Sequence, residues 1–200
     1  MQNKCWSKSH LKNKDFIVEY SAMKISIAKN SGFCFGVKRA IQIAKETADK
    51  RKNVYIKGDL VHNETVCEEI KEKGIARVDS LSSVPNGAVL IIKAHGEPLE
   101  THLIAQKKNI EIIDATCPMV KDIHEKAKDL ENKGYQIIVV GEKNHQETIG
   151  ILGNIQKGLV LENVKDIAKI KTKLKKKIAI VCQSTQTISN ITQVAAALLK

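Results

Sequence analysis

Aromatic residues are scarce in this chain of 200 residues, at 4% of the sequence. Its hydrophobic content of 42% is enough for a core. With so few aromatic side chains, that core must consist mainly of Ile, Val, Leu and Ala. The length suits one large domain or two small ones.

The cysteines do not form the pattern of a disulfide framework. There are five of them, an odd number, at irregular spacing. The first 22 residues are polar and of mixed charge, so they do not resemble a secretory signal. No apolar run reaches the length of a membrane span. We therefore expect a cytoplasmic protein whose cysteines are ligands, nucleophiles or core residues.

Arginine is rare, although the formal net charge is +11. Lysine supplies nearly all of the positive charge, and a lysine-rich, solvated surface is the simplest interpretation. The alternative is attraction of anions such as phosphorylated substrates, an acidic protein or nucleic acid. Nucleic acid is disfavoured because no basic helix with interleaved aromatic residues is present.

From Met23 onward, strand-like and helix-like segments alternate. The patterns predict strands at 24–28, 53–57, 88–93, 110–113, 135–140, 159–161 and 177–182. Helices are predicted near 36–51, 64–73, 97–108, 118–133, 145–153 and 164–170, and from about 187. This alternation predicts an α/β fold with parallel sheets and flanking helices.

The even spacing of the elements predicts two similar α/β units. We expect an N-terminal extension at 1–22, a first unit at 23–116 and a second unit at 117–200. The last segment, ITQVAAALLK, is apolar and helical without a cap. A helix of this kind normally leads to another strand, so we expect the chain to be incomplete.

Residues with reactive or polar side chains follow the strand-like runs. They are Cys34, His62, His95, Cys117 and His145, with Gln183, Ser184 and Thr185 after the last run. The carboxyl ends of strands point into the ligand crevice of an open α/β sheet. The sequence therefore predicts a binding site at this edge.

Cys34 and Cys117 each lie between a strand and a helix. Backbone N–H groups at a helix N-terminus lower the pKa of a thiol and favour a thiolate. Either cysteine alone can equally be a core residue. Both at equivalent positions suggest two converging ligands, although not a zinc ribbon, which needs CxxC pairs. Cys67 is expected in the core, and Cys5 and Cys182 are assigned no function.

The three histidines at strand ends can donate hydrogen bonds to a phosphate or hydroxyl group. With Ser184 and Thr185 they would form a largely neutral anion site that also uses helix N-termini. Glu147 lies two residues after His145 and is the candidate to move a proton. Spacing alone favours an ordinary glutamate in the first turn of a helix.

Six motifs in order resemble the 4-hydroxy-3-methylbut-2-enyl diphosphate reductase family, which performs the last step of the non-mevalonate isoprenoid pathway. The motifs are GFCFGVKRAI, VHN, AHG, DATCPMV, NHQETIG and VCQST. The resemblance implies part of a trefoil of three α/β units, with the third unit absent here. It implies a [4Fe–4S] cluster held by three cysteines, of which Cys34 and Cys117 are two. It also makes His62, His95, His145, Ser184 and Thr185 substrate-binding residues and Glu147 the catalytic proton donor.

The sequence departs from the family pattern in several places. The third cysteine and a serine–asparagine motif that binds the diphosphate would lie beyond Lys200. Cys182 is a poor substitute because it ends the interior of a strand. Two thiolates alone should hold a labile cluster. Ser184 stands where threonine is usual, and AHGEP replaces the commoner AHGV.

The implied reaction adds two electrons, removes a hydroxyl group as water, and yields isopentenyl and dimethylallyl diphosphates. A basic surface would help to dock an acidic electron donor of the flavodoxin or ferredoxin type. Two alternatives stay open at this point. One is a hydrolase or transferase with Cys34 as nucleophile and His95 as base. The other is a non-catalytic diphosphate-binding module in which the cysteines are core residues.

Overall fold

The computed structural model describes residues 17–20, 23–29 and 31–199, and these fall into two compact units that divide between Cys34 and Phe35. In the first unit, β1 (Ile17–Tyr20) pairs with β2 (Met23–Ser26) in an antiparallel hairpin. The strand expected at 24–28 is therefore present, but its partner lies inside the expected extension. Most of that extension, with Cys5, lies outside the described residues. Ile25 and Ile27 of the first unit are exposed.

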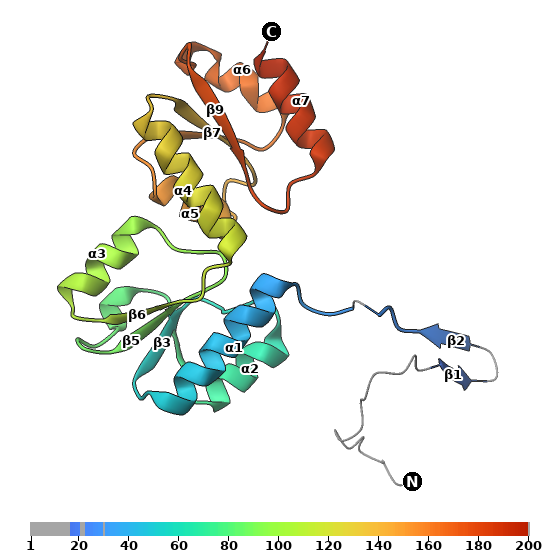
Figure 1. The fold of residues 1–200 in the computed structure, drawn as a ribbon, viewed down its shortest axis with the longest axis vertical. Coiled ribbons are helices and arrows are strands. Elements are labelled where there is room, and N and C mark those ends of the chain that lie inside the picture. Colours follow the sequence, from blue (N-terminus) through green and yellow to red (C-terminus); the bar gives the residue numbers. More distant parts are fainter. Residues whose placement is uncertain (1–16, 21–22, 30, 200) are drawn as a thin grey trace. The chain divides into compact units, whose positions relative to one another are not determined.

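The second unit begins with a sheet of four parallel strands in the order β4–β3–β5–β6. These strands are β3 (Val54–Lys57), β4 (Ala76–Val78), β5 (Val89–Ile92) and β6 (Glu111–Asp114). Helices α1 (Phe35–Lys50) and α2 (Glu64–Glu72) pack on one face, and α3 (Leu99–Lys107) packs on the other (Figure 1). The short helix η1 (Leu81–Ser83) joins the α3 side.

Strand β5 is the centre of this sheet, and all four of its residues are buried. Because side chains alternate across a strand, Val89 and Ile91 pack with α1 and α2, and Leu90 and Ile92 pack with α3. The sheet is therefore covered on both faces, as parallel sheets require. Apolar side chains packed on both faces of the sheet therefore fix the position of its carboxyl edge.

A second sheet has three parallel strands in the order β8–β7–β9. They are β7 (Gln136–Val140), β8 (Gly158–Leu161) and β9 (Ile178–Cys182). The helices are α4 (Pro118–Asn132), α5 (Gln146–Gly153), α6 (Ile167–Ile170) and α7 (Ile188–Leu198), with short η2 (Val164–Asp166) and η3 (Lys171–Lys173). In β7, Ile137 and Val139 face α4 and α5, and Ile138 and Val140 face α6 and α7.

The parallel α/β fold expected from the sequence is confirmed. Helix α4 starts at Pro118, and Gly134 follows its end with φ +82°, as the sequence predicts. Strand β4 and its pairing with β3 were not expected. The predicted boundary at 116/117 falls between the two sheets, but the division into two units at that point stays a prediction. Within the described ranges, no helix is long and apolar enough to cross a membrane.

Candidate functional site

The structure brings together the three histidines that follow strands. His62 follows β3, His95 follows β5, and His145 follows β7 at the N-cap of α5. The ring centroids of His62 and His95 are 5.5 Å apart, and those of His95 and His145 are 5.6 Å apart. The cluster thus draws on the carboxyl ends of strands from both sheets, at the edge where α/β proteins bind ligands.

His95 is the central ring of the cluster and is kept neutral. Burial lowers its pKa to about 4, and the positive charge of Lys93 acts in the same direction. Its Nδ1 atom is buried without a hydrogen-bond partner among the described residues. A neutral imidazole has one N–H donor and one acceptor, so His95 can bind a ligand oxygen without carrying charge.

His145 caps α5 with its own ring. The backbone N–H of Glu147 donates to His145 Nδ1 at 3.2 Å. Because Nδ1 accepts this bond, the neutral ring carries its proton on Nε2. The cap therefore fixes the tautomer and leaves an N–H donor on the side of the ring away from the helix.

Glu147 is almost fully buried, at 2% exposure. The backbone N–H of Ser184 donates to its Oε1 atom at 2.6 Å, and the Ser184 hydroxyl donates to its Oε2 atom at 2.8 Å. The pair connects the first turn of α5 with the loop after β9. Its environment differs from the solvent-exposed position typical of a first-turn glutamate, and it joins two residues that the sequence had assigned to the site separately.

The loop after β9 is held by Gln183, whose side chain is buried. Its Nε2 donates to Thr185 Oγ1 at 2.8 Å, and its Oε1 accepts from the backbone N–H of Glu142 at 3.0 Å. Because the Thr185 oxygen is the acceptor here, its own O–H proton can be offered to a ligand. The Ser184 proton, in contrast, is directed to Glu147. The Thr185 hydroxyl can therefore donate to a ligand, whereas the Ser184 hydroxyl donates to another side chain of the protein.

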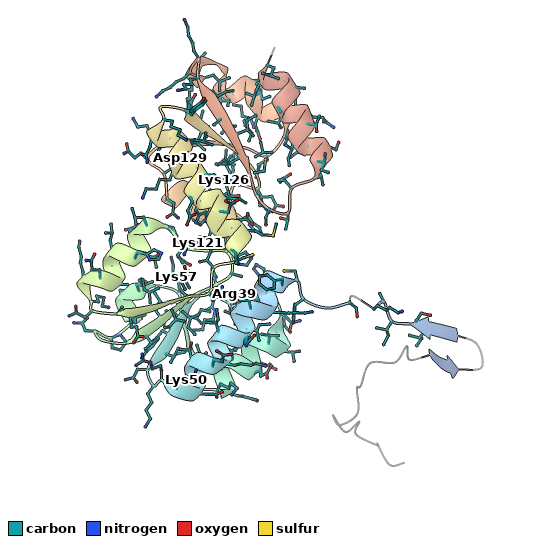
Figure 2. All side chains as sticks on the ribbon, in the orientation of Figure 1. Arg39, Lys50, Lys57, Lys121, Lys126 and Asp129 are labelled. Atoms are coloured by element: carbon teal, nitrogen blue, oxygen red, sulfur yellow. The ribbon has the colours of Figure 1, made fainter. Side chains whose placement is uncertain are left out.

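Cys117 is half-buried and occupies the N-cap position of α4. The first turn of α1 lies directly against it, because a Cβ atom placed on Gly36 would be 2.6 Å from Cys117 Sγ. One turn further along α1, Arg39 (Figure 2) donates from Nη1 to the Thr116 carbonyl at 3.1 Å. Cys117 thus lies between the N-terminus of α4 and the first turn of α1.

Cys34 is exposed and ends the first unit, one residue before α1. Its pairing with Cys117 stays a prediction. Among the described residues, no group of three or more His, Cys, Asp or Glu side chains is arranged to hold a metal ion. The donor chemistry of the two cysteines suits iron, but they can supply only part of a ligand set.

Two further cysteines, Cys67 and Cys182, lie within the described residues. Cys67 is half-buried and its Sγ donates to the Val61 carbonyl at 3.3 Å. Cys182 packs against the core of the second sheet, and burial raises the pKa of its thiol. A thiol with a raised pKa is a weaker candidate for a thiolate ligand.

Sequence reasoning missed several polar residues beneath the histidines. Lys93 and Glu97 are buried, at 6% and 5% exposure, on either side of the AHG motif. His124 of α4 also lies there: a Cβ atom on Gly96 would be 2.7 Å from its Cε1 atom. A lysine directly after a fully apolar strand, followed four residues later by a glutamate, was the available signal.

Comparison with known proteins places these residues in a family context. The family model described as "LytB protein" matches residues 25–200. The chain is 38% identical over 165 residues to the 4-hydroxy-3-methylbut-2-enyl diphosphate reductase of Clostridioides difficile (strain 630), covering 82% of this chain and 59% of that protein.

Two solved structures are similar in fold. The reductase from Plasmodium falciparum, named for E-1-hydroxy-2-methyl-but-2-enyl-4-diphosphate, superposes with TM-score 0.79 at 35% identity, over 85% of this chain and 54% of that one. An (E)-4-hydroxy-3-methyl-but-2-enyl diphosphate reductase, described as the terminal enzyme of the non-mevalonate pathway, gives TM-score 0.76 at 36% identity, over 86% and 62%.

The chain spans between 53% and 62% of the length of the curated relatives it matches. These relatives share one name, and that name does not favour a hydrolase, a transferase or a non-catalytic module. The match runs from the end of the hairpin to the last helix and includes every candidate site residue. This chain belongs to the LytB family.

Proposed function

We propose that this protein reduces 4-hydroxy-3-methylbut-2-enyl diphosphate to isopentenyl and dimethylallyl diphosphates. The observation that carries the proposal is the buried Glu147 carboxylate, joined to Ser184 by two hydrogen bonds beside the His145 cap. This arrangement places a carboxyl group that can take up and release a proton beside the His145 ring. Membership of the LytB family supports the choice of substrate.

The diphosphate would be held by histidine and hydroxyl donors and by a helix N-terminus. His145 offers its Nε2–H, because its Nδ1 atom accepts from the helix. His62 and His95 complete the cluster, and Thr185 offers a hydroxyl proton from the facing loop. The N-terminal end of α5 adds a favourable dipole for the anion. A neutral His95 ring spares the site the cost of burying an unpaired charge in the ligand-free protein.

Glu147 would supply the proton for the departing hydroxyl group. Its buried carboxyl group reaches the ligand side through the Ser184 hydroxyl, which bonds to Oε2 at 2.8 Å. In the structure the Ser184 hydroxyl donates to Glu147. Once Glu147 has taken up a proton, this bond would reverse, and Ser184 would pass its own proton outward as it takes one from Glu147. A serine is sufficient for this step, because the step uses only the hydroxyl group.

The electrons would come from a [4Fe–4S] cluster, with Cys34 and Cys117 as two of its ligands. When bound, such a cluster would supply the two electrons that the reduction requires, received one at a time from an external donor. The chain's own residues would hold the cluster and orient the substrate. Cys117 lies at a helix N-terminus against Gly36, where the absence of a Cβ leaves room for the sulfur. An acidic flavodoxin or ferredoxin in the cytoplasm suits a chain with net charge +11.

The diphosphate site can be tested by calorimetry on this chain with inorganic diphosphate. We expect His145→Ala to weaken binding at least about tenfold, because it removes both a donor and the α5 cap. His102→Ala, in α3 and outside the cluster, is the matched control. Equal binding by His145→Ala and the unchanged chain would contradict the proposed site.

A further inference from the structure

A buried group of polar side chains lies under the histidine cluster. Lys93 Nζ donates to Gln146 Oε1 at 3.0 Å and lies 3.8 Å from Glu97 Oε1. The other Glu97 oxygen, Oε2, accepts from Lys57 Nζ at 2.9 Å and from Thr101 Oγ1 at 3.1 Å. The Lys93 and Glu97 side chains are only 7% and 4% exposed.

The surroundings of Lys93 are matched to its ammonium group. Gly58, which follows β3 with φ +69°, lies beside it: a Cβ atom there would be in ordinary contact with Nζ, at 3.4 Å. Burial lowers the pKa of Lys93, and the Glu97 carboxylate opposes that shift. A buried charge is tolerated only when it is paired and hydrogen-bonded, and Glu97 and Gln146 meet both conditions.

The Lys93–Gln146 bond links the two halves of the histidine cluster. Lys93 lies two residues before His95, at the carboxyl end of β5. Gln146 is the first residue of α5, between His145 and Glu147. One hydrogen bond therefore joins the segment that carries His95 to the turn that carries His145 and Glu147. The two partners are 53 residues apart in the chain.

We propose that Lys93 is a positioning residue that holds His95 and His145 at the spacing of a diphosphate site, through its bond to Gln146, with Glu97 as its counter-charge. The inference rests on the proposed diphosphate site for its ligand. It gives Glu97 of the AHGEP segment a role, because this carboxylate balances an ammonium that would otherwise be buried unpaired. Lys57 shares Glu97 but makes no hydrogen bond with Gln146 among the described residues, so its role here is charge balance.

The test combines Lys93→Met and Gln146→Leu with the matched control Lys57→Met. Lys93→Met leaves Glu97 paired with Lys57, so no buried carboxylate is orphaned. Gln146→Glu keeps an acceptor for Lys93 and is the rescue variant. Each variant is compared with the unchanged chain by urea unfolding, by binding of inorganic diphosphate, and by NMR of the histidine ring signals.

The informative NMR signals are the crossed ones, meaning those of the histidine that lies on the opposite segment from the substitution. Lys93→Met should shift the ring signals of His145, and Gln146→Leu should shift those of His95, while Lys57→Met shifts neither. Both site variants should bind inorganic diphosphate about tenfold more weakly, with Gln146→Glu within about threefold of the unchanged chain.

Two results would overturn the inference. In one, the crossed signals stay in place in both site variants. In the other, Lys57→Met moves them equally, which would indicate a general effect of charge or stability. If the unchanged chain does not bind diphosphate, the proposed function fails in this chain, and the crossed NMR signals still decide whether Lys93 positions the rings.

Discussion

Ser184 donates both of its hydrogen-bonding protons to one carboxylate, that of Glu147, at 2.6 and 2.8 Å. The bonds connect the loop after β9 with the first turn of α5, across 37 residues of chain. They satisfy both oxygens of a carboxyl group that is 2% exposed. A buried carboxylate without such partners would cost several kcal/mol, so this pair is a condition for the local fold as well as for chemistry.

The first prediction concerns this pair. Ser184→Ala removes the hydroxyl bond to Glu147 Oε2 and leaves the backbone bond, so we expect a loss of about 1–3 kcal/mol in the free energy of unfolding. Ser184→Thr keeps the hydroxyl and should lose less than half of that. Urea unfolding measures both. Ser189→Ala, exposed in α7, should stay within about 0.5 kcal/mol of the unchanged chain. Equal stability of Ser184→Ala and Ser189→Ala would show that the hydroxyl bond is unimportant.

The second prediction concerns the contact between α1 and Cys117. In Gly36→Ala the new Cβ atom would lie 2.6 Å from Cys117 Sγ and 3.0 Å from its Cβ, so one of the two segments must move. Overpacking of this kind costs about 1–3 kcal/mol of unfolding free energy. The displaced thiol should also react with an alkylating reagent at a changed rate.

Lys38→Ala, exposed in the same turn, is the control for the change to alanine in α1. It should leave both the urea midpoint and the alkylation rate of Cys117 unchanged. A Gly36→Ala protein that behaves like Lys38→Ala would contradict the close approach of α1 and α4.

The third prediction explains the glycine of the AHG motif. Gly96 has φ +74°, and a Cβ atom there would be 2.7 Å from His124 Cε1. Gly96→Ala should therefore cost about 1 kcal/mol for the backbone and a further 1–3 kcal/mol for the clash. In a His124→Ala background only the backbone cost should remain. A double-mutant cycle measures this coupling, and strictly additive losses would exclude the steric contact.

The fourth prediction is a pH dependence that originates in His95. Its pKa is about 4 in the folded chain, against 6.5 as the ordinary value. Between these values the unfolded chain binds a proton at this ring and the folded chain does not, so stability falls as pH decreases from 6.5 to about 4 and levels off below. Because the ring is partly open to solvent, the loss should be on the order of 1–2 kcal/mol.

The measurement compares unfolding free energies of the unchanged chain and His95→Gln across this range. Glutamine does not titrate, so the difference between the two curves isolates the His95 contribution from carboxyl groups that titrate in both proteins. The unchanged chain should lose stability relative to His95→Gln as the pH falls. Parallel curves would mean that His95 is as accessible in the folded chain as in the unfolded one.

Much of the fold was readable from the sequence, because buried parallel strands are short apolar runs between helical patterns. The β5 and β7 segments, VLII and QIIVV, are of this kind. Strand β4 was not readable: it has three residues with Arg77 at its centre, and only pairing with β3 makes it a strand. The hairpin partner of β2 was missed because residues 1–22, which are polar and of mixed charge, were interpreted as an extension.

The site was only partly predictable from the sequence, because some of its contacts join residues that are far apart in the chain. Residues directly after strands could be found, since strand ends share one edge of a sheet. The burial of Glu147 depends on Ser184, and that of Lys93 depends in part on Gln146, and no local pattern specifies either of these contacts. Contacts between residues far apart in sequence, rather than spacing, determine which polar groups become buried.

The His145 ring caps the first turn of α5 by accepting from the Glu147 N–H. The residue proposed to bind the anion and the residue proposed to donate the proton therefore share one turn of helix. If that turn frays, the His145 ring loses its bond to the helix as the Glu147 carboxylate loses its bond to Ser184. Anion binding and proton donation are then lost in the same event. The fraction of molecules with an assembled site then equals the fraction in which this turn is closed. Hydrogen exchange at the single amide of Glu147 would report that fraction, and ligand binding should slow the exchange in proportion to its occupancy.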